Sequence, residues 1–175
     1  LDIIVSSDDK EILNIGKKYT NILELREDYL ADDHTSILEV LKSISLKFDY
    51  DYYILLQPTN PLRPPDLINE AIALYNNNKL NVISISILKE KFGKLLNNSF
   101  EPINYSFGER SQDLKEDFFI EDGLIYLFSQ SSIKSNQLLI SPNNVIVTQK
   151  NFPLIDIDTI EDFLFAEFII KNHGT

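Results

Sequence analysis

The stretch ILLQPTNPLRPPDL, residues 54–67, passes abruptly from apolar to polar side chains. The apolar run from Tyr52 to Leu56 is typical of a central parallel strand that is covered on both faces. Amide, hydroxyl and guanidinium groups follow it directly and are held between prolines. Because ligands of open parallel sheets bind beyond the carboxyl ends of the strands, these polar groups lie where a ligand is expected.

On both sides of this stretch, short strands alternate with helices. Further β-rich runs predict strands over residues 3–6, 21–25, 81–88, 123–128 and 145–148. Apolar residues at helical spacing predict helices over residues 10–19, 35–48, 64–78 and 159–172. The alternation predicts one α/β domain over residues 1–175, with a mostly parallel sheet and helices on both faces.

The helix starts are predicted from capping residues and prolines. We expect Ser7, Asp8 or Asp9 to cap the first helix, and Thr35 or Asp33 to cap the second. The pair of prolines at residues 64–65 suits the first turn of the third helix, where no backbone donor is lost. Before the last helix, Thr159 is expected as the cap, with an acid three residues later in the reciprocal position.

Composition limits the classes of function. The chain has 175 residues, two histidines, no cysteine and a formal net charge of −11. This charge, without a basic stripe, argues against nucleic acid as a partner. No apolar run approaches the roughly 20 residues of a membrane helix, so no membrane association is expected. The absence of cysteine fits a reducing compartment, which predicts a cytoplasmic location, and any metal should have oxygen ligands.

Two acids near the C-terminal end form the strongest candidate site. Asp156 and Asp158 lie two positions apart in LIDIDTIEDF, residues 154–163. In extended backbone their side chains point to one side, with Cα atoms about 7 Å apart, while Ile155 and Ile157 face the core. Carboxylates placed in this way can share a divalent cation. The spacing leaves two interpretations open, a metal site and acids that only cap the next helix.

The polar loop after the apolar run is the second candidate. The prolines around it reduce the entropy of ordering the loop. The amides of Gln57 and Asn60 could then hydrogen-bond a hydroxylated ligand, and Arg63 offers a fork for a carboxylate or phosphate. The alternative is a plain turn before a helix, with Arg63 solvated.

Residues 89–120 differ from the rest of the chain. They are polar and irregular in pattern, with scattered aromatic residues. A loop of this length in a compact domain is functional or reaches toward a partner. Arg110 and Gln112 lie in it, although a surface role for Arg110 stays open. After it, Gly123 would allow close backbone approach, and Tyr126 is either core or part of a site.

Taken in order, six segments resemble the acylneuraminate cytidylyltransferases, the CMP-sialic acid synthetases. They cover nearly the whole chain: IIVSSDD, LREDYLADDHTS, LLQPTNPLR, RSQDL, DGLIYLF and IDIDTIEDF. The resemblance implies a Rossmann-like fold of the nucleotide-diphospho-sugar transferase type. It also implies transfer of CMP from CTP to a nonulosonic acid, release of pyrophosphate, Mg²⁺ or Mn²⁺ as cofactor, and a place in bacterial surface glycan biosynthesis.

The same resemblance implies roles for individual residues. Catalytic and metal-binding roles fall on Asp156 and Asp158. The expected sugar-binding residues are Gln57, Asn60, Arg63, Arg110, Gln112 and Tyr126, and the expected nucleotide-binding residues are Asp8, Arg26 and Thr35. Residues 89–120 would form the dimerisation element of a homodimer, and Arg110 could reach the partner's sugar site.

The chain also departs from the family pattern. The family's opening strand and phosphate-binding loop have no counterpart, so we expect this chain to be the interior of a longer polypeptide. Asn60 stands where the family usually has serine. The family's Arg-Pro-Asn-Gly reads Ile-Glu-Asp-Gly at residues 120–123, so an arginine is lost and an acid is gained. Two alternatives stay open: another sugar acid, such as 3-deoxy-octulosonate, legionaminate or pseudaminate, or a catalytically silent homologue that binds nucleotide or dimerises.

Overall fold

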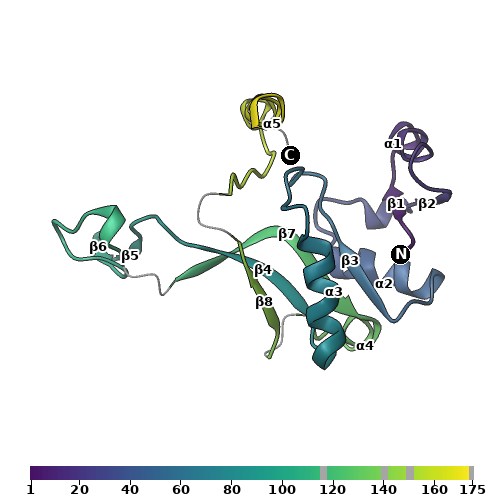
Figure 1. Ribbon diagram of the computed structural model, residues 1–175, viewed down its shortest axis with the longest axis horizontal. Coiled ribbons are helices and arrows are strands. Elements are labelled where there is room, and N and C mark those ends of the chain that lie inside the picture. The colour runs from purple at the N-terminus through teal and green to yellow at the C-terminus, as the bar shows by residue number, and fades with distance from the viewer. Residues whose placement is uncertain (115–117, 139–141, 149–151, 174–175) are drawn as a thin grey trace. The chain divides into compact units, whose positions relative to one another are not determined.

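The computed structural model describes residues 1–114, 118–138, 142–148 and 152–173. Contacts divide the chain into two compact units (Figure 1). Unit 1 comprises residues 1–50 and 133–136, and unit 2 comprises residues 51–132 and 137–175. No helix in the described ranges is both long enough and apolar enough to cross a membrane. A single domain over residues 1–175 stays a prediction.

Unit 1 is built on a strand–helix–strand connection. The strands β1 and β2 pair in parallel, with Ser7 opposite Leu25 at their carboxyl ends. A Cβ added at Gly16 would lie 3.0 Å from a methyl group of Val5, so the helix between the strands lies close against β1. The elements are β1 (Ile4–Ser7), α1 (Lys10–Gly16), β2 (Ile22–Leu25), the 3₁₀ turn η1 (Asp28–Leu30) and α2 (Ile37–Lys47).

One of the expected caps of the first helix is confirmed, whereas the caps predicted for the second helix were wrong. Asp9, expected beside Ser7 and Asp8, caps α1 and accepts a 2.6 Å hydrogen bond from the Glu11 N–H. Ser36, not Thr35 or Asp33, caps α2, because Ser36 and Glu39 form a reciprocal capping box. Runs of adjacent capping residues carry equal local propensity, so only the backbone path selects among them.

Unit 2 is built on a mixed four-stranded sheet in the order β3-β7-β4-β8. The strands β3, β4 and β8 run in one direction, and β7 runs against them. The α/β class is therefore confirmed, but the central parallel position predicted for β3 was wrong, since its partner in the described part of the sheet is antiparallel β7. An apolar run predicts burial and does not specify neighbours. The strands are β3 (Tyr52–Leu55), β4 (Val82–Ile87), β7 (Phe119–Ser129) and β8 (Asn144–Val147).

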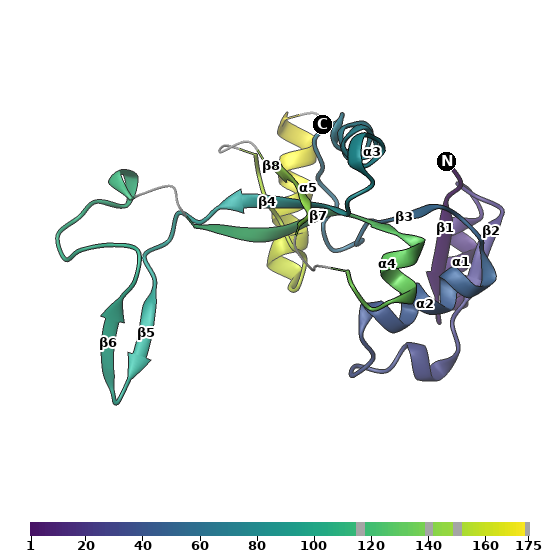
Figure 2. The same cartoon turned by 90° about the horizontal axis from the view of Figure 1, so that it is seen from below.

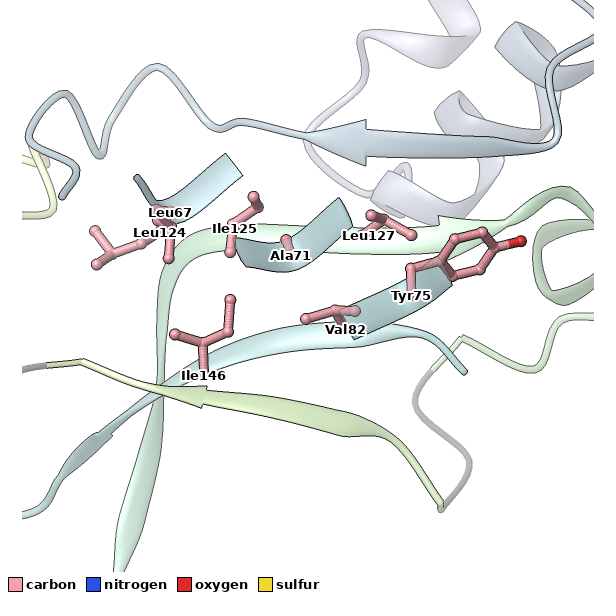
Figure 3. Packing of buried hydrophobic residues seen from close by; sticks show 8 residues of the cluster. All are labelled: Leu67, Ala71, Tyr75, Val82, Leu124, Ile125, Leu127 and Ile146. Carbon is pink, nitrogen blue, oxygen red and sulfur yellow. The ribbon is translucent and has the colours of Figure 1, made fainter. Parts of the chain in front are cut away.

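Helix α3 (Leu67–Asn78) covers one face of this sheet and closes the main core (Figure 3). The core residues are Leu67, Ala71, Tyr75, Val82, Leu124, Ile125, Leu127 and Ile146. The two prolines do not enter the first turn as predicted, because α3 begins after its N-cap, Asp66. The last helices are α4 (Gln130–Lys134) and α5 (Ile160–His173).

Residues 89–120, here called the excursion, begin where β4 and β7 stop pairing. The last link is the Leu88 N–H, which donates to the Phe118 carbonyl at 2.9 Å. Figure 2 shows β5 (Gly93–Leu96) and β6 (Ser99–Pro102) as an antiparallel hairpin, which the sequence pattern had left as irregular chain. Asn97 and Asn98 form its turn with positive φ angles of 50° and 63°, as tight hairpin turns require. The 3₁₀ turn η2 (Ser111–Asp113) follows, and residues 115–117 lie outside the described part.

Candidate functional site

A bulge in β7 forms the centre of the candidate site. Ile83 of β4 pairs with Tyr126, and Ile85 pairs with Glu121. Ser84 alone lies between these pairs on β4, whereas residues 122–125 lie between them on β7. The extra residues leave the ladder, and Gly123 takes a φ of +72°, which favours glycine. Bulges of this kind often redirect side chains next to active sites.

The polar loop after β3 lies directly against the bulge. A Cβ at Gly123 would be 3.2 Å from the Asn60 amide nitrogen and 3.4 Å from the Gln57 amide oxygen. Asn60 is 3% exposed, so its amide is fixed inside the unit. Two predicted substrate-binding residues, Gln57 and Asn60, are therefore close together where β3 ends.

Arg63 joins the loop to the bulge through the backbone. Its Nε donates to the Leu124 carbonyl and an Nη donates to the Gln57 carbonyl, both at 2.7 Å. Burial lowers the pKa of the Arg63 guanidinium. In the structure, Arg63 therefore binds two backbone carbonyls of the protein and positions the loop against the bulge. Its predicted contact with a substrate carboxylate or phosphate stays a prediction.

Asp156 reaches the same place from the far end of the chain. The Asn60 amide donates to an Asp156 carboxylate oxygen at 3.2 Å, across 96 positions of sequence. A backbone hydrogen bond joins the same two segments, since the Ile157 N–H donates to the Thr59 carbonyl at 2.8 Å. Ile155 is buried and Asp156 is exposed, as the alternation predicted. Ile155 and Ile157 pack in a small cluster with Leu62, Ala166 and Ile169.

Asp158 lies between this contact and the start of α5. Its carboxylate is exposed, and its N–H donates to Asp162 at 3.2 Å. The Thr159 hydroxyl donates to Asp162 at 2.7 Å and accepts from the Asp162 N–H at 3.2 Å, so the predicted reciprocal cap is confirmed. Hydrogen bonds from the hydroxyl and backbone of Thr159 hold the pKa of Asp162 below its usual value. Because Thr159 and Asp162 together cap the helix, Asp156 and Asp158 are not needed for that purpose.

Tyr126 adds a phenol to the site. Its hydroxyl donates to Glu121 at 3.2 Å, and its ring stacks on Phe128 with centroids 5.9 Å apart. Burial raises the pKa of Tyr126 to about 12, with further contributions from Glu121, Asp122 and Asp156. The phenol therefore stays protonated at neutral pH and can act as a hydrogen-bond donor.

Sequence reasoning missed a set of polar groups that bind the bulge residue Asp122. Ser84 and Ser86 on β4 and Thr148 after β8 all donate to the Asp122 carboxylate. All three donors are almost fully buried. The available signal was the pattern VISISI of β4, whose serines fall on one face at a period of two. A buried serine in a strand needs a partner, and here the partner is a carboxylate.

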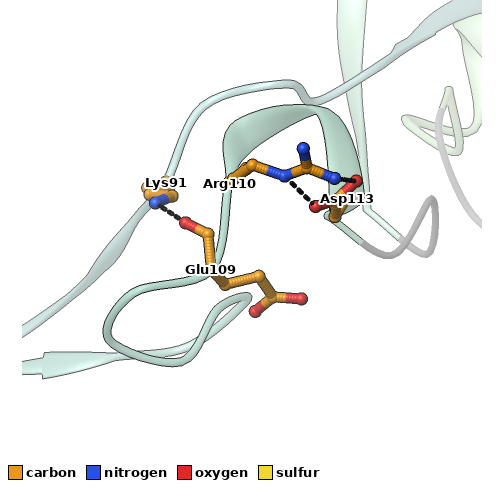
Figure 4. Close-up of polar contacts among 4 residues, drawn as sticks. All are labelled: Lys91, Glu109, Arg110 and Asp113. Atoms are coloured by element: carbon orange, nitrogen blue, oxygen red, sulfur yellow. Dashed lines mark hydrogen bonds and ion pairs between the residues drawn. The ribbon is translucent and has the colours of Figure 1, made fainter.

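Two predicted sugar-site residues lie in the excursion. Arg110 forms a double ion pair with Asp113, at 2.6 and 3.1 Å (Figure 4). Lys91 donates to the Glu109 carbonyl beside it. Within the described residues, no hydrogen bond or ion pair joins Arg110 or Gln112 to the residues around Gly123. Their role in substrate binding stays a prediction.

Unit 1 brings two of the predicted nucleotide-binding residues together. Asp8 and Arg26 follow the carboxyl ends of neighbouring parallel strands, and their side chains lie 3.5 Å apart. The Arg26 N–H also donates to the Ser7 carbonyl at 2.9 Å, and its buried Nε has no partner among the described groups. The third predicted residue, Thr35, has a different hydrogen-bond partner: its hydroxyl donates to the Tyr29 carbonyl at 2.6 Å.

Comparisons with known proteins agree on one family. The family described as "Cytidylyltransferase" matches residues 1–155. The CMP-N,N'-diacetyllegionaminic acid synthase of Legionella pneumophila is 26% identical over 184 residues, which cover 97% of this chain and 78% of that protein. The pseudaminic acid cytidylyltransferase of Campylobacter jejuni is 26% identical over 187 residues, which cover 98% of this chain and 79% of that protein.

A solved structure extends the comparison to the fold. The chain matches CMP:2-keto-3-deoxy-manno-octonic acid synthetase in complex with CTP, with a TM-score of 0.64 and 12% identity. The match covers 98% of this chain and 82% of the other. Similarity at this identity concerns the fold, and it confirms the α/β architecture that the sequence predicted.

Proposed function

Because this chain belongs to the cytidylyltransferase family, we propose that it transfers CMP from CTP to the anomeric hydroxyl of a nonulosonic acid and releases pyrophosphate. The observation that carries the proposal is the hydrogen bond between Asn60 and Asp156. This hydrogen bond joins the two strongest candidate sites of the sequence, the amide-rich loop and the acid pair. Both lie next to the β7 bulge. The names of both relatives support a nonulosonic acid as the acceptor.

The acid pair fits a magnesium ion shared with substrate. Mg²⁺ in nucleotide sites is commonly held by one or two carboxylates together with phosphate oxygens and water. Asp156 and Asp158 are exposed and precede a helix that does not need them as caps. No group of three acids, histidines or cysteines that could enclose a metal occurs in the described ranges. Bound there, Mg²⁺ would stabilise negative charge on the phosphate oxygens.

In the proposed reaction, the oxygen of the sugar's anomeric hydroxyl forms a bond to the α-phosphorus of CTP. The bond from that phosphorus to the bridging oxygen breaks, pyrophosphate leaves with the electron pair, and the hydroxyl proton passes to solvent. Gln57 would orient the sugar acid through its amide, whereas the buried Asn60 would hold Asp156 in place, and a direct contact of Asn60 with substrate stays a prediction. Tyr126 stays protonated because its pKa is about 12, and while its O–H donates to Glu121 its oxygen would accept a hydrogen bond from the substrate.

The direct test is formation of CMP-sugar from CTP and Mg²⁺ with four acceptors: N-acetylneuraminate, legionaminate, pseudaminate and 3-deoxy-octulosonate. We expect product with at least one acceptor, and loss of about 100-fold or more in kcat for Asp156→Ala if the metal site is lost. Glu161→Ala removes a nearby exposed acid outside the pair and should leave the rate unchanged. CTP binding without product from any acceptor would instead support a silent homologue.

A homodimer formed through residues 89–120 and a cytoplasmic location belong to the same proposal. In support of the dimer, the excursion exposes large apolar side chains of a kind that usually mark an interaction surface. They include Leu95, Leu96, Phe100, Ile103 and Phe107.

A further inference from the structure

Asp122 accepts hydrogen bonds from β4, from β7 and from the residue that follows β8. One carboxylate oxygen accepts from the Ser84 hydroxyl and from the Leu124 N–H, the latter at 3.2 Å. The other accepts from the hydroxyls of Ser86 at 2.7 Å and Thr148 at 2.5 Å. A carboxylate can accept at about four positions, so these donors use its capacity fully.

The same network replaces the ladder bonds that the bulge removes. Backbone N–H groups that lose their strand partners must find others. The Leu124 N–H is bound by Asp122, and the Ile125 N–H donates to the Ser84 hydroxyl at 3.1 Å. Ser84 is therefore both an acceptor from the bulge and a donor to Asp122. The shape of the bulge thus depends on one acid and one hydroxyl.

Two other bulge residues, Gly123 and Leu124, contact the candidate active site. Gly123, next to Asp122, lies against the Asn60 and Gln57 amides. The Leu124 carbonyl, two residues along, accepts from Arg63, which also holds the Gln57 carbonyl. Asn60 in turn donates to Asp156. A continuous set of contacts therefore runs from the Asp122 carboxylate to the proposed metal-binding acid.

We infer that Asp122 is a positioning residue for the proposed reaction: its network with Ser84, Ser86 and Thr148 fixes the β7 bulge, which holds the Gln57 and Asn60 amides in place against Asp156. Asp122 is the first residue of the bulge, its carboxylate accepts the four hydrogen bonds described above, and it is assigned no contact with substrate. The kinetic part of this inference rests on the proposed function, whereas its structural part does not.

The structural part is tested without substrate. In ¹⁵N NMR spectra we expect Asp122→Ala to shift the side-chain amide signals of Gln57 and Asn60, and Asp122→Asn to shift them less. The asparagine keeps an acceptor for Leu124, and the hydroxyls of Ser86 and Thr148 can turn to accept from its amide. Val40→Ala, which creates a buried defect in unit 1, is the control and should leave both signals in place. Unshifted amide signals in folded Asp122→Ala overturn the inference.

The kinetic part uses the same variants at a temperature where each is folded. We expect kcat/KM for the sugar acid to fall about 100-fold in Asp122→Ala, as for other mutations that misplace a reacting group, and to be largely restored in Asp122→Asn. If Asp122 only stabilises the fold, kcat and KM per folded molecule equal those of the wild type, and the inference is overturned. Should Asp122→Ala not fold, the Ser86→Ala/Thr148→Val variant removes two of the donors more gently and is measured in both assays.

The two proposals fail in different ways. A wild-type protein that makes no CMP-sugar with any acceptor contradicts the proposed function, while shifted amides in Asp122→Ala would still support positioning by Asp122. A wild-type protein that is active, with Asp122→Ala equally active per folded molecule, contradicts only the positioning role.

Discussion

Gly123 is the residue on which the close contact between bulge and loop depends. It combines a φ of +72° with amide groups 3.2 and 3.4 Å from the position of a Cβ. Alanine there would have to adopt a left-handed backbone, at about 1–2 kcal/mol, and would also press on the buried Asn60. The position therefore joins a backbone requirement with a steric one.

Gly123→Ala should reduce the free energy of unfolding by about 1–2 kcal/mol and also lower kcat/KM, because the Asn60 amide must move. Gly108→Ala is the matched control, since Gly108 has a φ of +91° with nothing within 4 Å of a Cβ. It should show the backbone strain and keep the activity. Urea unfolding and the CMP-transfer assay measure the two effects. Equal activity of the two variants would show that the contact with Asn60 is unimportant.

The surroundings of Tyr126 predict how the stability of the protein depends on pH. Its folded pKa of about 12 lies above the ordinary value of 10.0, so folding favours the protonated phenol. The stabilisation is fully present below pH 10 and is lost as the pH rises toward 12. We expect the 295 nm absorbance difference between wild type and Tyr126→Phe to report a phenol titrating near pH 12. A midpoint near pH 10 would contradict the burial beside Glu121 and Asp122.

At the scale of elements, helix starts depend on which of several adjacent capping residues the backbone selects. Ser36 begins α2 with a reciprocal pair of hydrogen bonds to Glu39. Replacing an N-cap serine with alanine costs about 1 kcal/mol. We expect this loss for Ser36→Ala in urea unfolding, while Ser43→Ala, within the same helix, should be neutral or slightly stabilising. Similar losses for both would mean that Ser36 is not the cap.

Individual helices and strands were easier to predict from the sequence than the pairing between strands. The alternation of Ile155 and Ile157 with acids follows from a local period of two, and the structure confirms that Ile155 is buried. The bulge could not be predicted, because it depends on the register between β4 and β7, which are separated by the whole excursion. The edge position of β3 in the described sheet was missed for the same reason. Pairing is a long-range property, and a single strand's composition does not contain it.

The same distinction separates the site residues. Gln57, Asn60 and Asp156 could be selected one by one, since amides and acids directly after apolar runs favour a binding site. Their mutual contact required the fold. Arg63 shows the limit of residue type, because a guanidinium that suits a phosphate also suits two carbonyls. The Asp122 network was hidden because its serines read as ordinary strand residues.

At the scale of the whole molecule, residues 89–120 bear on whether the protein forms a homodimer. The β5–β6 hairpin is held by its own ladder and turn, and it presents Leu95, Leu96 and Phe100 as exposed apolar side chains. Asn104 ties its base through the Phe92 N–H at 2.9 Å and the Glu90 carbonyl at 2.8 Å. A hairpin with an internally satisfied base and apolar exposed residues is suited to bury them against a second copy of this chain.

We therefore expect the protein to be dimeric in sedimentation experiments and Leu95→Glu/Phe100→Glu to convert it to a monomer, because two buried charges without partners oppose association. Lys94→Glu/Glu101→Lys exchanges one pair of opposed charges on the same two strands and should leave the dimer intact. If Arg110 completes the partner's sugar site, the monomeric variant should also lose activity, with the amide signals of Gln57 and Asn60 unchanged. A monomeric wild type, or a monomeric variant with full activity, would remove residues 89–120 from the proposed active site.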